Sequence, residues 1–547
     1  QFTYGGGQVS GPASNQEDIN RNMVLDMESL LTYSKKISDH RIKVLLGTSS
    51  RSESFATTMA YRLGFPSNDL SSIHAGSTDG LSNSGSKNKS TFASYFTPFN
   101  YDFQGKYLFE ANLRRDGSSK FANGHRWGWF PSFSAAWNLT SEKFLENVGW
   151  LNALKLRGSW GRLGNHRISD FMFMQRIALG QNYTFGGPVA IGAAQVVADN
   201  PDITWEKTSE TNIGIDFTFF NRISGSIDLY NRYTDDILTV VPVSASYGLP
   251  APTVNAGAMS NKGIEAEIRY SESKGKFKYD IAVNASYNKN RVEKYHGRDI
   301  FEVNAEGGAI VREKGIPWNS YIGYEWIGYF MSDEEAAKSA VHHPSVGAGD
   351  LKFKDQNGDG KIDGQDRVIL GKPVPSFTYG LNAGFNYKNF DFGFFFHGVS
   401  DVQRYIRVRG YMPFMRNGKA LAMHLDRMIV ENGVVVKEGY FPKTLLEGGD
   451  GGKNIVSSGF TIHNASYLRM KNIQIGYTLP ANVTGKSFIT RARIYVSGQN
   501  LLTVTKFPDG YDPEANNTAF HGHILGGAAG WSYPQAKSFT VGLDVNF

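Results

Sequence analysis

The chain ends in the ten residues Ser538-Phe539-Thr540-Val541-Gly542-Leu543-Asp544-Val545-Asn546-Phe547, in which polar and apolar side chains alternate without a break. Because successive side chains of a β-strand point to opposite faces, this segment is predicted to be a strand with one wholly apolar face and one polar face. Such a strand suits a wall that has lipid on one side and water on the other. The edge of a soluble β-sandwich also alternates, but it rarely ends a chain on an aromatic residue.

The same period of two recurs in residues 212–219, 264–270 and 279–287. In the second of these segments Glu265, Glu267 and Arg269 alternate with apolar residues, and charges at every second position need water on that face. A wet lumen provides that water, and so does the outer face of a sandwich. This pattern alone therefore leaves both architectures open.

Over the whole chain the pattern predicts fifteen strands of about ten or more residues, which is the length of tilted membrane strands. The predicted ranges are 24–34, 41–54, 91–99, 104–115, 131–140, 152–162, 208–220, 222–236, 261–272, 276–291, 376–387, 389–400, 466–479, 490–503 and 537–547. An all-antiparallel barrel closes only with an even number of strands. The odd number indicates either one miscounted strand or further strands upstream of Gln1.

The connections between these strands decide between the two architectures, because after the first strand they alternate between short and long. The short ones include 35–40, 100–103, Asn221, 273–275, Lys388 and 480–489, and 141–151 is the longest of this set. The long ones are 55–90, 116–130, 163–207, 237–260, 292–375, 401–465 and 504–536. Between antiparallel neighbours this alternation puts every long loop on one side of the sheet. Outer-membrane barrels have that asymmetry, with short periplasmic turns and long extracellular loops, whereas a sandwich has no reason to show it. The sequence thus predicts an all-β fold, a transmembrane antiparallel β-barrel, over residues 1–547.

The composition agrees with one large repetitive architecture. The 547 residues include 61 Gly and 9 + 27 + 37 = 73 aromatic residues, only 20% are charged, and no Pro/Ser or Gly/Ser linker divides them. The excess of 57 − 51 = 6 basic residues is scattered, so no nucleic-acid surface is predicted. There is no Cys, which excludes disulfides and leaves the loops to be ordered by packing or by ions.

A helical membrane protein is excluded. No stretch approaches the roughly 18–20 uncharged apolar residues of a spanning helix, and the mean hydropathy is −0.35. A β-barrel remains compatible with such a low value, since its apolar residues occupy only alternate positions. The first residues, beginning with Gln1, show neither an initiator Met nor a signal peptide, so we expect a processed or partial chain.

Several short motifs resemble those of one family of outer-membrane proteins, and they occur in that family's order over roughly residues 20–547. They are Arg115-Asp116-Gly117-Ser118-Ser119-Lys120-Phe121 with Phe130-Pro131-Ser132, Leu154-Lys155-Leu156-Arg157-Gly158-Ser159-Trp160-Gly161 with Gly164-Asn165, Asn200-Pro201 with Trp205-Glu206-Lys207-Thr208, Asn255-Ala256-Gly257 with Asn261-Lys262-Gly263-Ile264-Glu265, Ser466-Tyr467-Leu468-Arg469-Met470-Lys471-Asn472, and Gly498-Gln499-Asn500-Leu501. The ordered set is similar to the carboxy-terminal part of SusC/RagA-type TonB-dependent transporters.

The resemblance implies a barrel of about 22 strands, of which this chain would supply the later ones. It also implies an amino-terminal plug and a TonB-contacting segment, which this sequence does not contain. Further implications are a SusD-like lipoprotein partner at the extracellular mouth, a location in the outer membrane in contact with its lipid, and energy supplied through TonB. The implied function is active import of an oligosaccharide or oligopeptide, and not enzymatic activity.

A candidate Ca²⁺ site lies in the long connection 292–375. Residues 355–366 fit a twelve-residue calcium loop, with Gly360 for the sharp turn at position 6 and oxygen ligands at positions 1, 3, 5, 7, 9 and 12. These ligands are the side chains of Asp355, Asn357, Asp359, Asp363 and Asp366 and the backbone carbonyl of Lys361. The last position is Asp rather than Glu, so its shorter arm predicts a modest affinity. The alternative is an ion-free turn rich in Asn, Asp and Gly.

Other signals favour structural explanations. The pairs His342-His343 and His521/His523 are typical of solvated loops, and the Gly-rich run 448–453 lacks phosphate-loop spacing. The long-loop aromatics Tyr247, Tyr411, Phe414, Trp531 and Tyr533 either pack between loops or contact a substrate. No catalytic set is present. Alternative functions are a passive porin, a surface adhesin, or a secreted β-rich enzyme or binding module, and no residue distinguishes a glycan from a peptide substrate.

Overall fold

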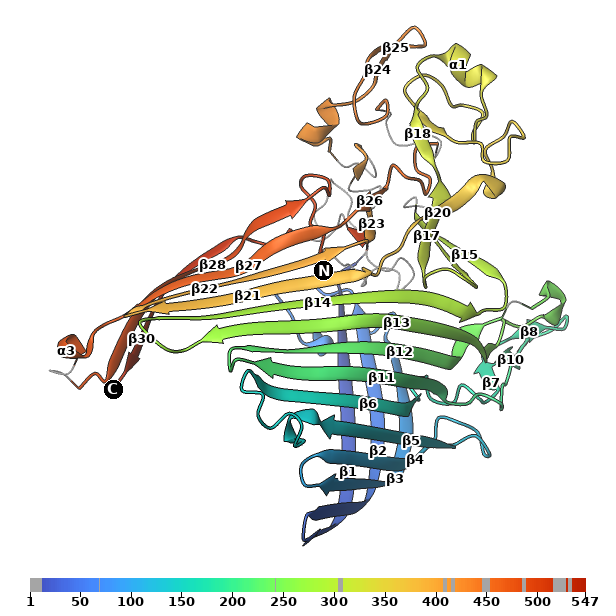
Figure 1. Ribbon diagram of the computed structural model, residues 1–547. Helices are drawn as coiled ribbons and strands as arrows, with labels where there is room; N and C mark the ends of the chain where they lie inside the picture. Colours follow the sequence, from blue (N-terminus) through green and yellow to red (C-terminus); the bar gives the residue numbers. More distant parts are fainter. Residues whose placement is uncertain are drawn as a thin grey trace. The chain divides into compact units, whose positions relative to one another are not determined.

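The predicted sheet is present in a computed structural model of the chain. The structure describes residues 12–67, 69–241, 243–303, 308–406, 411–414, 419–444, 453–484, 488–514, 528–529 and 534–547. Its largest sheet has fifteen strands, and each pairs with the neighbours that precede and follow it in this set. Figure 1 shows these strands in chain order, coloured from blue to red.

Each of the fifteen predicted strands corresponds to one strand of this sheet. They are β1 (Ser14–Ile37), β2 (His40–Leu63), β3 (Ser82–Phe103), β4 (Tyr107–Ser118), β5 (Trp127–Asn138), β6 (Leu151–Asn165), β11 (Glu206–Phe219), β12 (Ile223–Val240), β13 (Thr253–Glu272), β14 (Phe277–Lys294), β21 (Phe377–Tyr387), β22 (Phe390–Ser400), β27 (Tyr467–Thr478), β28 (Arg491–Thr505) and β30 (Ser538–Asn546). Number and order are as predicted.

Several strands extend further than the sequence pattern indicated. β1 and β2 have 24 residues each and β3 has 22, so the predicted long loop 55–90 shortens to 64–81. The predicted loops 116–130 and 237–260 likewise shorten, to 119–126 and 241–252. The connection 119–126 is even shorter than 139–150, so the alternation of lengths is not strict at that point. The missed start of β3, Ser82-Asn83-Ser84, is polar on both faces and therefore shows no period of two. Other missed ends, such as the start of β5 at Trp127, carry apolar residues.

The shortest turns have the backbone that such hairpins need. The turns predicted as the single residues Asn221 and Lys388 are longer in the structure, 220–222 and 388–389, because the flanking strands end earlier or begin later than predicted. Both residues have φ of 53°, in the left-handed region. Two-residue hairpins favour this region because its twist matches that of the strands. In β21–β22 the register then runs without interruption from Tyr387↔Phe390 to Phe377↔Ser400.

The chain divides into two compact units, which are considered separately. The first comprises the described parts of Gln1–Ala135, Ser159–Ser209 and Asp235–Ala256. Within it, one face of β1–β4 is apolar and exposed: Leu25 is 67% exposed, Met27 70% and Leu31 68%. On the opposite face Ser94 and Asp116 are buried and hydrogen-bonded to each other at 2.5 Å. Exposure of the apolar face and burial of the polar one reverse the pattern of a soluble protein.

The second unit comprises Ala136–Gly158, Glu210–Thr234 and Gly257–Phe547, and it shows the same reversal at the terminal strand. Phe539 is 74% exposed, Val541 76% and Leu543 63%. Their polar neighbours include Asp544, which pairs in register with Arg493 and lies 3.3 Å from it. The apolar row of β30 is therefore not packed into a dry interior. No helix among the described residues is long and apolar enough to cross a membrane.

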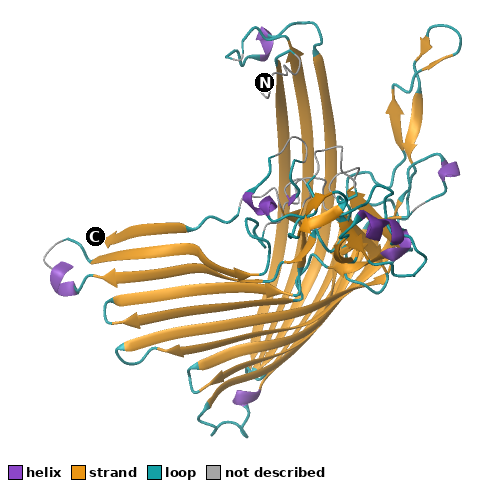
Figure 2. Ribbon diagram, turned by 90° about the horizontal axis from the view of Figure 1, so that it is seen from above, coloured by secondary structure: helices purple, strands orange, loops and turns teal. Residues whose placement is uncertain are grey.

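The long loops of both units carry small elements of their own. The loop strands are β7 (Arg176–Leu179), β8 (Tyr183–Thr184), β9 (Val189–Ala190), β10 (Ala193–Val197), β15 (Arg298–Val303), β16 (Gly308–Glu313), β17 (Ser320–Tyr324), β18 (Trp326–Tyr329), β19 (Leu351–Phe353), β20 (Arg367–Gly371), β23 (Gln403–Ile406), β24 (Ile429–Glu431), β25 (Val434–Lys437), β26 (Ile462–Asn464) and β29 (Ala528–Ala529). The helices are α1 (Asp333–Lys338), α3 (Ala481–Thr484) and the 3₁₀ turns η1 (Ile73–Ala75), η2 (Leu139–Ser141), η3 (Ala245–Tyr247), η4 (Gly364–Asp366) and η6 (Ala422–Leu425). Figure 2 shows how little helix accompanies the strands.

The loops of the second unit enclose a hydrophobic core, which the sequence pattern did not predict. It joins the connection between β14 and β21 to that between β22 and β27, and it includes the fully buried Leu351 and Phe460 together with Tyr411. Burial raises the pKa of Tyr411, and the neighbouring Tyr440 raises it further. The Tyr411 hydroxyl donates to the Tyr440 hydroxyl at 3.1 Å. Tyr411 is thus a packing residue. Trp531, Tyr533, residues 448–452 of the Gly-rich run 448–453 and His521/His523 lie outside the described residues.

Candidate functional site

The predicted calcium loop folds as a series of tight turns held by its own side chains. The two carboxylate oxygens of Asp355 accept hydrogen bonds from the N–H groups of Gly358 at 2.7 Å and Gly360 at 2.9 Å. The two glycines have φ of 75° and 83°, a left-handed backbone that other residues rarely adopt. Asp355 thus holds the tight turn at the start of the loop.

The middle of the loop repeats this arrangement. Asn357 Oδ1 accepts from the N–H of Asp359, and Asp359 Oδ1 accepts from the N–H of Lys361, both at 2.9 Å. Asp363 Oδ1 accepts from the N–H of Gln365 at 2.8 Å. Four of the predicted ligand side chains are therefore held by local bonds to backbone N–H groups.

The twelfth position, Asp366, closes the loop onto its beginning. It is fully buried, and its carboxylate accepts from the N–H groups of Gln356 and Asp363, both at 2.8 Å. The hydrogen bond from Asp363 N–H, with others from the backbone of Gln356 and Asn357, lowers the pKa of Asp366. Between these polar positions Ile362 packs into the loop core. The loop is thereby fixed at both ends.

The residue types fit Ca²⁺, although their carboxylates are turned to backbone N–H groups. Among the described residues, no three His, Cys, Asp or Glu side chains are arranged as a metal-binding group. A carboxylate has about four acceptor positions, so one or two N–H bonds leave lone pairs for an ion. Hard cations such as Ca²⁺ take six to eight oxygen ligands from this kind of loop.

A buried carboxylate with no signal in the sequence pattern holds two long loops together. Asp350 is fully buried, and its Oδ2 lies 3.1 Å from Lys443 Nζ and 3.2 Å from Lys453 Nζ. Asn454 Nδ2 donates to its Oδ1 at 3.0 Å. Asp350 belongs to the connection between β14 and β21, whereas its three partners belong to that between β22 and β27. This cluster fastens one loop to the other.

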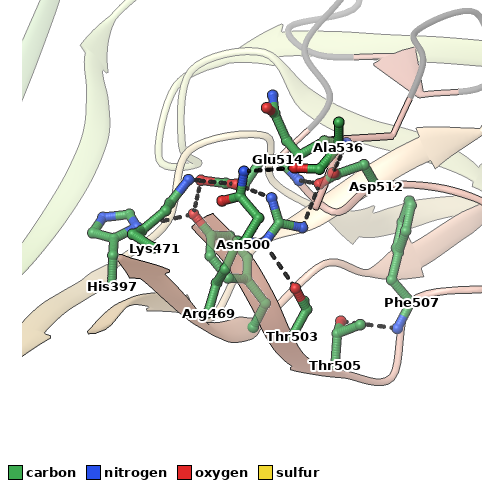
Figure 3. A network of polar contacts seen from close by, with 12 residues as sticks. His397, Arg469, Lys471, Asn500, Thr503, Thr505, Phe507, Asp512, Glu514 and Ala536 are labelled. Carbon is green, nitrogen blue, oxygen red and sulfur yellow. Dashed lines mark hydrogen bonds and ion pairs between the residues drawn. The ribbon is translucent and has the colours of Figure 1, made fainter. Parts of the chain in front are cut away.

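A second polar network, drawn in Figure 3, fastens the last long loop to β27. Arg469 donates to Asp512 at 2.8 Å and also bonds Glu514, while Lys471 Nζ reaches Glu514 at 2.6 Å. Arg469 and Asp512 side chains are only 4% and 3% exposed. Arg469 and Lys471 are two residues apart on β27 and both reach Glu514, and the strand register is irregular between Met470 and Asn472.

The environment of this network keeps its two acids ionised. Burial alone would raise the pKa of Asp512, but hydrogen bonds from Arg469 and the N–H groups of Gln535 and Glu514 outweigh it and lower the pKa. Burial opposes ionisation of Glu514 in the same way, and Lys471 and Tyr467 outweigh it. Tyr467 and Arg469 lie in the predicted Ser466–Asn472 motif, but their partners, over forty residues away, leave no local signal.

The polar face of the first unit contains a water-accessible pocket of about 500 Å³. Asp26 and Arg51 form an ion pair at 2.6 Å across β1 and β2, and Glu28 and Glu53 lie beside them. His166, whose Nδ1 lies 3.0 Å from the Ser118 hydroxyl, completes one side. A polar and charged lining is typical of a barrel lumen.

Paired strands, an exposed apolar face, a charged opposite face and long loops on one side define this molecule as a membrane-spanning antiparallel β-barrel protein of the outer-membrane class. Residues 2–501 match the family model described as TonB dependent receptor-like, beta-barrel. The chain belongs to the TonB-dependent receptor β-barrel family, which places it in the outer membrane.

Individual relatives agree with this family. TonB-dependent receptor P3 of Formosa agariphila is 31% identical over 538 residues, covering 95% of this chain and 52% of the relative. TonB-dependent receptor SusC of Bacteroides thetaiotaomicron is 31% identical over 469 residues, covering 84% of this chain and 44% of the relative. The solved structure of the RagAB peptide transporter has a TM-score of 0.80 and 25% identity, covering 98% of this chain and 56% of that one. The chain thus spans about half the length of these relatives.

Proposed function

We propose that this chain forms the barrel wall of a transporter that actively imports an oligomeric nutrient, an oligosaccharide or an oligopeptide, across the outer membrane. The observation that carries the proposal is the likeness to SusC and to the RagAB peptide transporter over nearly the whole chain. The charged pocket on the polar face of β1–β3 agrees with passage of a polar solute. The interlocked long loops agree with a built extracellular surface rather than with loose connections.

The proposal includes two protein partners. A SusD-like lipoprotein would cap the extracellular mouth, on the loops that Asp350 and Arg469 hold in place. TonB would supply energy from the proton gradient, through a segment outside this sequence. Support for both partners comes from the SusC and RagAB likeness, and the long loops offer the surface that the first partner needs.

Uptake by cells tests this function. A strain lacking the gene, and the same strain complemented with the full-length gene, are given fluorescent oligosaccharide or oligopeptide mixtures too large for porins. Complementation is expected to restore uptake of one of the two classes, and an uncoupler of the proton gradient should abolish it. Uptake that persists with the gradient collapsed would mean a passive porin. Restored surface adhesion with no uptake would mean an adhesin.

We further propose that residues 355–366 bind a structural Ca²⁺ ion that stiffens the extracellular loop. The spacing of the oxygen ligands, the tight turns held by the side chains of Asp355, Asn357 and Asp359, and the two left-handed glycines support it. Extracellular Ca²⁺ sites bind at roughly 10⁻⁴–10⁻³ M, so a modest affinity is sufficient.

Calorimetry on chelator-treated protein in detergent tests the ion. One Ca²⁺ is expected per chain, with binding lost in Asp359→Ala and retained in Asp509→Ala, a matched change of an exposed aspartate outside the loop. Ca²⁺ should also slow proteolysis within 355–366 in the wild type and in Asp509→Ala, but not in Asp359→Ala. The absence of binding heat, together with unchanged proteolysis in Asp359→Ala, would show that the loop is an ion-free turn.

A further inference from the structure

One cation on the apolar face of the first unit is held by aromatic rings and faces no acid. Arg115 pairs in register with Tyr95, and its guanidinium carbon lies 4.9 Å from the ring centre of Trp127 and 5.3 Å from that of Trp129. Tyr95 stacks on Trp127 with ring centres 5.9 Å apart. Trp and Arg in such contact attract each other through the electron-rich ring face. The rings thus fix the guanidinium in place.

The backbone beneath is shaped for this contact. A Cβ on Gly117 would come within 2.8 Å of the Trp127 ring, so only glycine allows the indole to lie across β4 at this point. Arg114, which precedes Arg115 on β4, points to the opposite face and donates to the Asp116 carboxylate at 2.7 Å. The charge of Arg114 is therefore neutralised by a carboxylate, whereas the guanidinium of Arg115 lies against tryptophan rings.

Arg115 lies where an apolar surface ends. On the same face Leu113 is 46% and Phe109 42% exposed, further toward the short turn 104–106. Trp127 and Trp129, 42% and 55% exposed, lie beside the longer connection 119–126 at the other end of β4. Exposed Trp and Tyr at the limit of an apolar band mark the membrane–water interface. Because the connection 119–126 is on the long-loop side, this is the interface of the outer leaflet.

More cations follow on the same face beyond Arg115. Lys87 pairs with Ala56 of β2, and Ala56 pairs with Arg21 of β1, so Lys87 and Arg21 lie on the same face. Lys89 and Met23 also lie on this face, two residues along their strands and nearer the membrane. All three basic residues are exposed, and neither they nor Arg115 have a carboxylate partner among the described residues. By register, β2, β3 and β4 carry no Asp or Glu on this face, and β1 carries only Glu17 at its far end. The charge is therefore uncompensated by the chain.

We propose that this face binds a phosphorylated lipid of the outer leaflet, with the lipid phosphate on Arg115. The guanidinium has five N–H donors, and stacking on Trp rings leaves its edge free to bond a phosphate in two-pronged fashion. The acyl chains then lie along the exposed Leu113 and Phe109, while Lys89, Lys87 and Arg21 attract anionic groups further from the bilayer. This lipid site does not depend on what the chain imports.

Native mass spectrometry of the protein in detergent micelles tests the site. The probes are monophosphoryl lipid A, the same lipid after enzymatic removal of its phosphate, and inorganic phosphate alone. Wild-type protein is expected to retain the phosphorylated lipid at least about tenfold more tightly than the dephosphorylated one, as one charge-assisted pair allows. Arg115→Gln should remove that preference, and Arg115→Lys should keep part of it, since Lys has the charge without the planar fork.

The matched control is Lys43→Gln, which removes one exposed cation from the opposite face of β2 and should retain the preference. Unheated gel mobility verifies that each variant barrel is folded, and Arg115→Lys serves as the reporter if Arg115→Gln does not fold. Equal retention of both lipids, an unchanged preference in Arg115→Gln, or displacement of the lipid by an equal concentration of inorganic phosphate would overturn the proposal.

Discussion

Replacing Arg469 by Met should release the last long loop without unfolding the sheet. The arginine and Asp512 are 4% and 3% exposed, so the change leaves a buried carboxylate without its cation. Breaking a buried ion pair on one side costs about 3–5 kcal/mol. The cost should lie at the lower end of this range, because Asp512 still accepts hydrogen bonds from the N–H groups of Glu514 and Gln535. Glu514 still accepts a hydrogen bond from Lys471. A cost of about 3 kcal/mol corresponds to roughly a hundredfold shift in loop opening.

Hydrogen exchange measures this shift directly at the amides of Glu514 and Gln535, both of which bond Asp512. Exchange there should accelerate by about a hundredfold, whereas ladder amides of β27 and β28 near Ile475 and Val496 should be unaffected. Arg491→Met is the matched control, because Arg491 has no ion pair among the described residues. The double variant Arg469→Met with Asp512→Asn should recover part of the protection, since no charge is then buried alone. Unchanged exchange in Arg469→Met, or equal acceleration in Arg491→Met, would refute the reasoning.

Three further perturbations follow from the structure. The pKa values of Asp512 and Glu514 are lowered from their ordinary values of 3.8 and 4.5, so the stability that these carboxylates give the loop is present at higher pH and is lost as acid protonates them. The hydrogen exchange rate of the Gln535 amide, corrected for the intrinsic effect of pH, should be constant down to about pH 5 and rise below about pH 4. In Gly164→Ala, a Cβ placed 2.1 Å from the Phe130 ring and 2.8 Å from Trp205 should destabilise the barrel by about 1–3 kcal/mol in thermal gel-shift assays, whereas Gly149→Ala, with open space around it, should not; equal melting of the two would contradict this. Asp350→Asn leaves Lys443 and Lys453 without a counter-charge and should accelerate proteolysis between β22 and β27 at least tenfold, relative to Asp509→Asn, and no difference would show that the cluster does not fasten the loops.

The strands were predictable because a membrane-spanning strand alternates apolar and polar residues. Lipid on one face and water on the other force alternation, as at Phe539, Val541 and Leu543, and all fifteen strands of the large sheet were found from it. The alternation fails where a strand leaves the bilayer and both faces meet water. The polar start of β3 around Ser82 was consequently missed.

The loops were less predictable, because their order comes from contacts between distant segments. Residues 355–366 could be singled out as a candidate ion site because a calcium loop is a local pattern with fixed spacing, and Ca²⁺ binding there stays a prediction. Asp350 with Lys453, and Arg469 with Asp512, are pairs between different loops or between a loop and a strand, and no periodicity connects them. The same holds for Arg115 between Trp127 and Trp129: the motif residues were noted, but the face they share is set by strand register.

The face of each strand that meets hydrocarbon can be identified with single cysteines, because the chain has no Cys of its own. Single cysteines at positions 539 to 544 can be spin-labelled in the protein reconstituted into lipid vesicles. Labels at Phe539, Val541 and Leu543 should be relaxed by oxygen, which partitions into lipid, and labels at Thr540, Gly542 and Asp544 by a water-soluble nickel chelate. Accessibility that does not alternate, or that alternates in the opposite sense, would contradict the account.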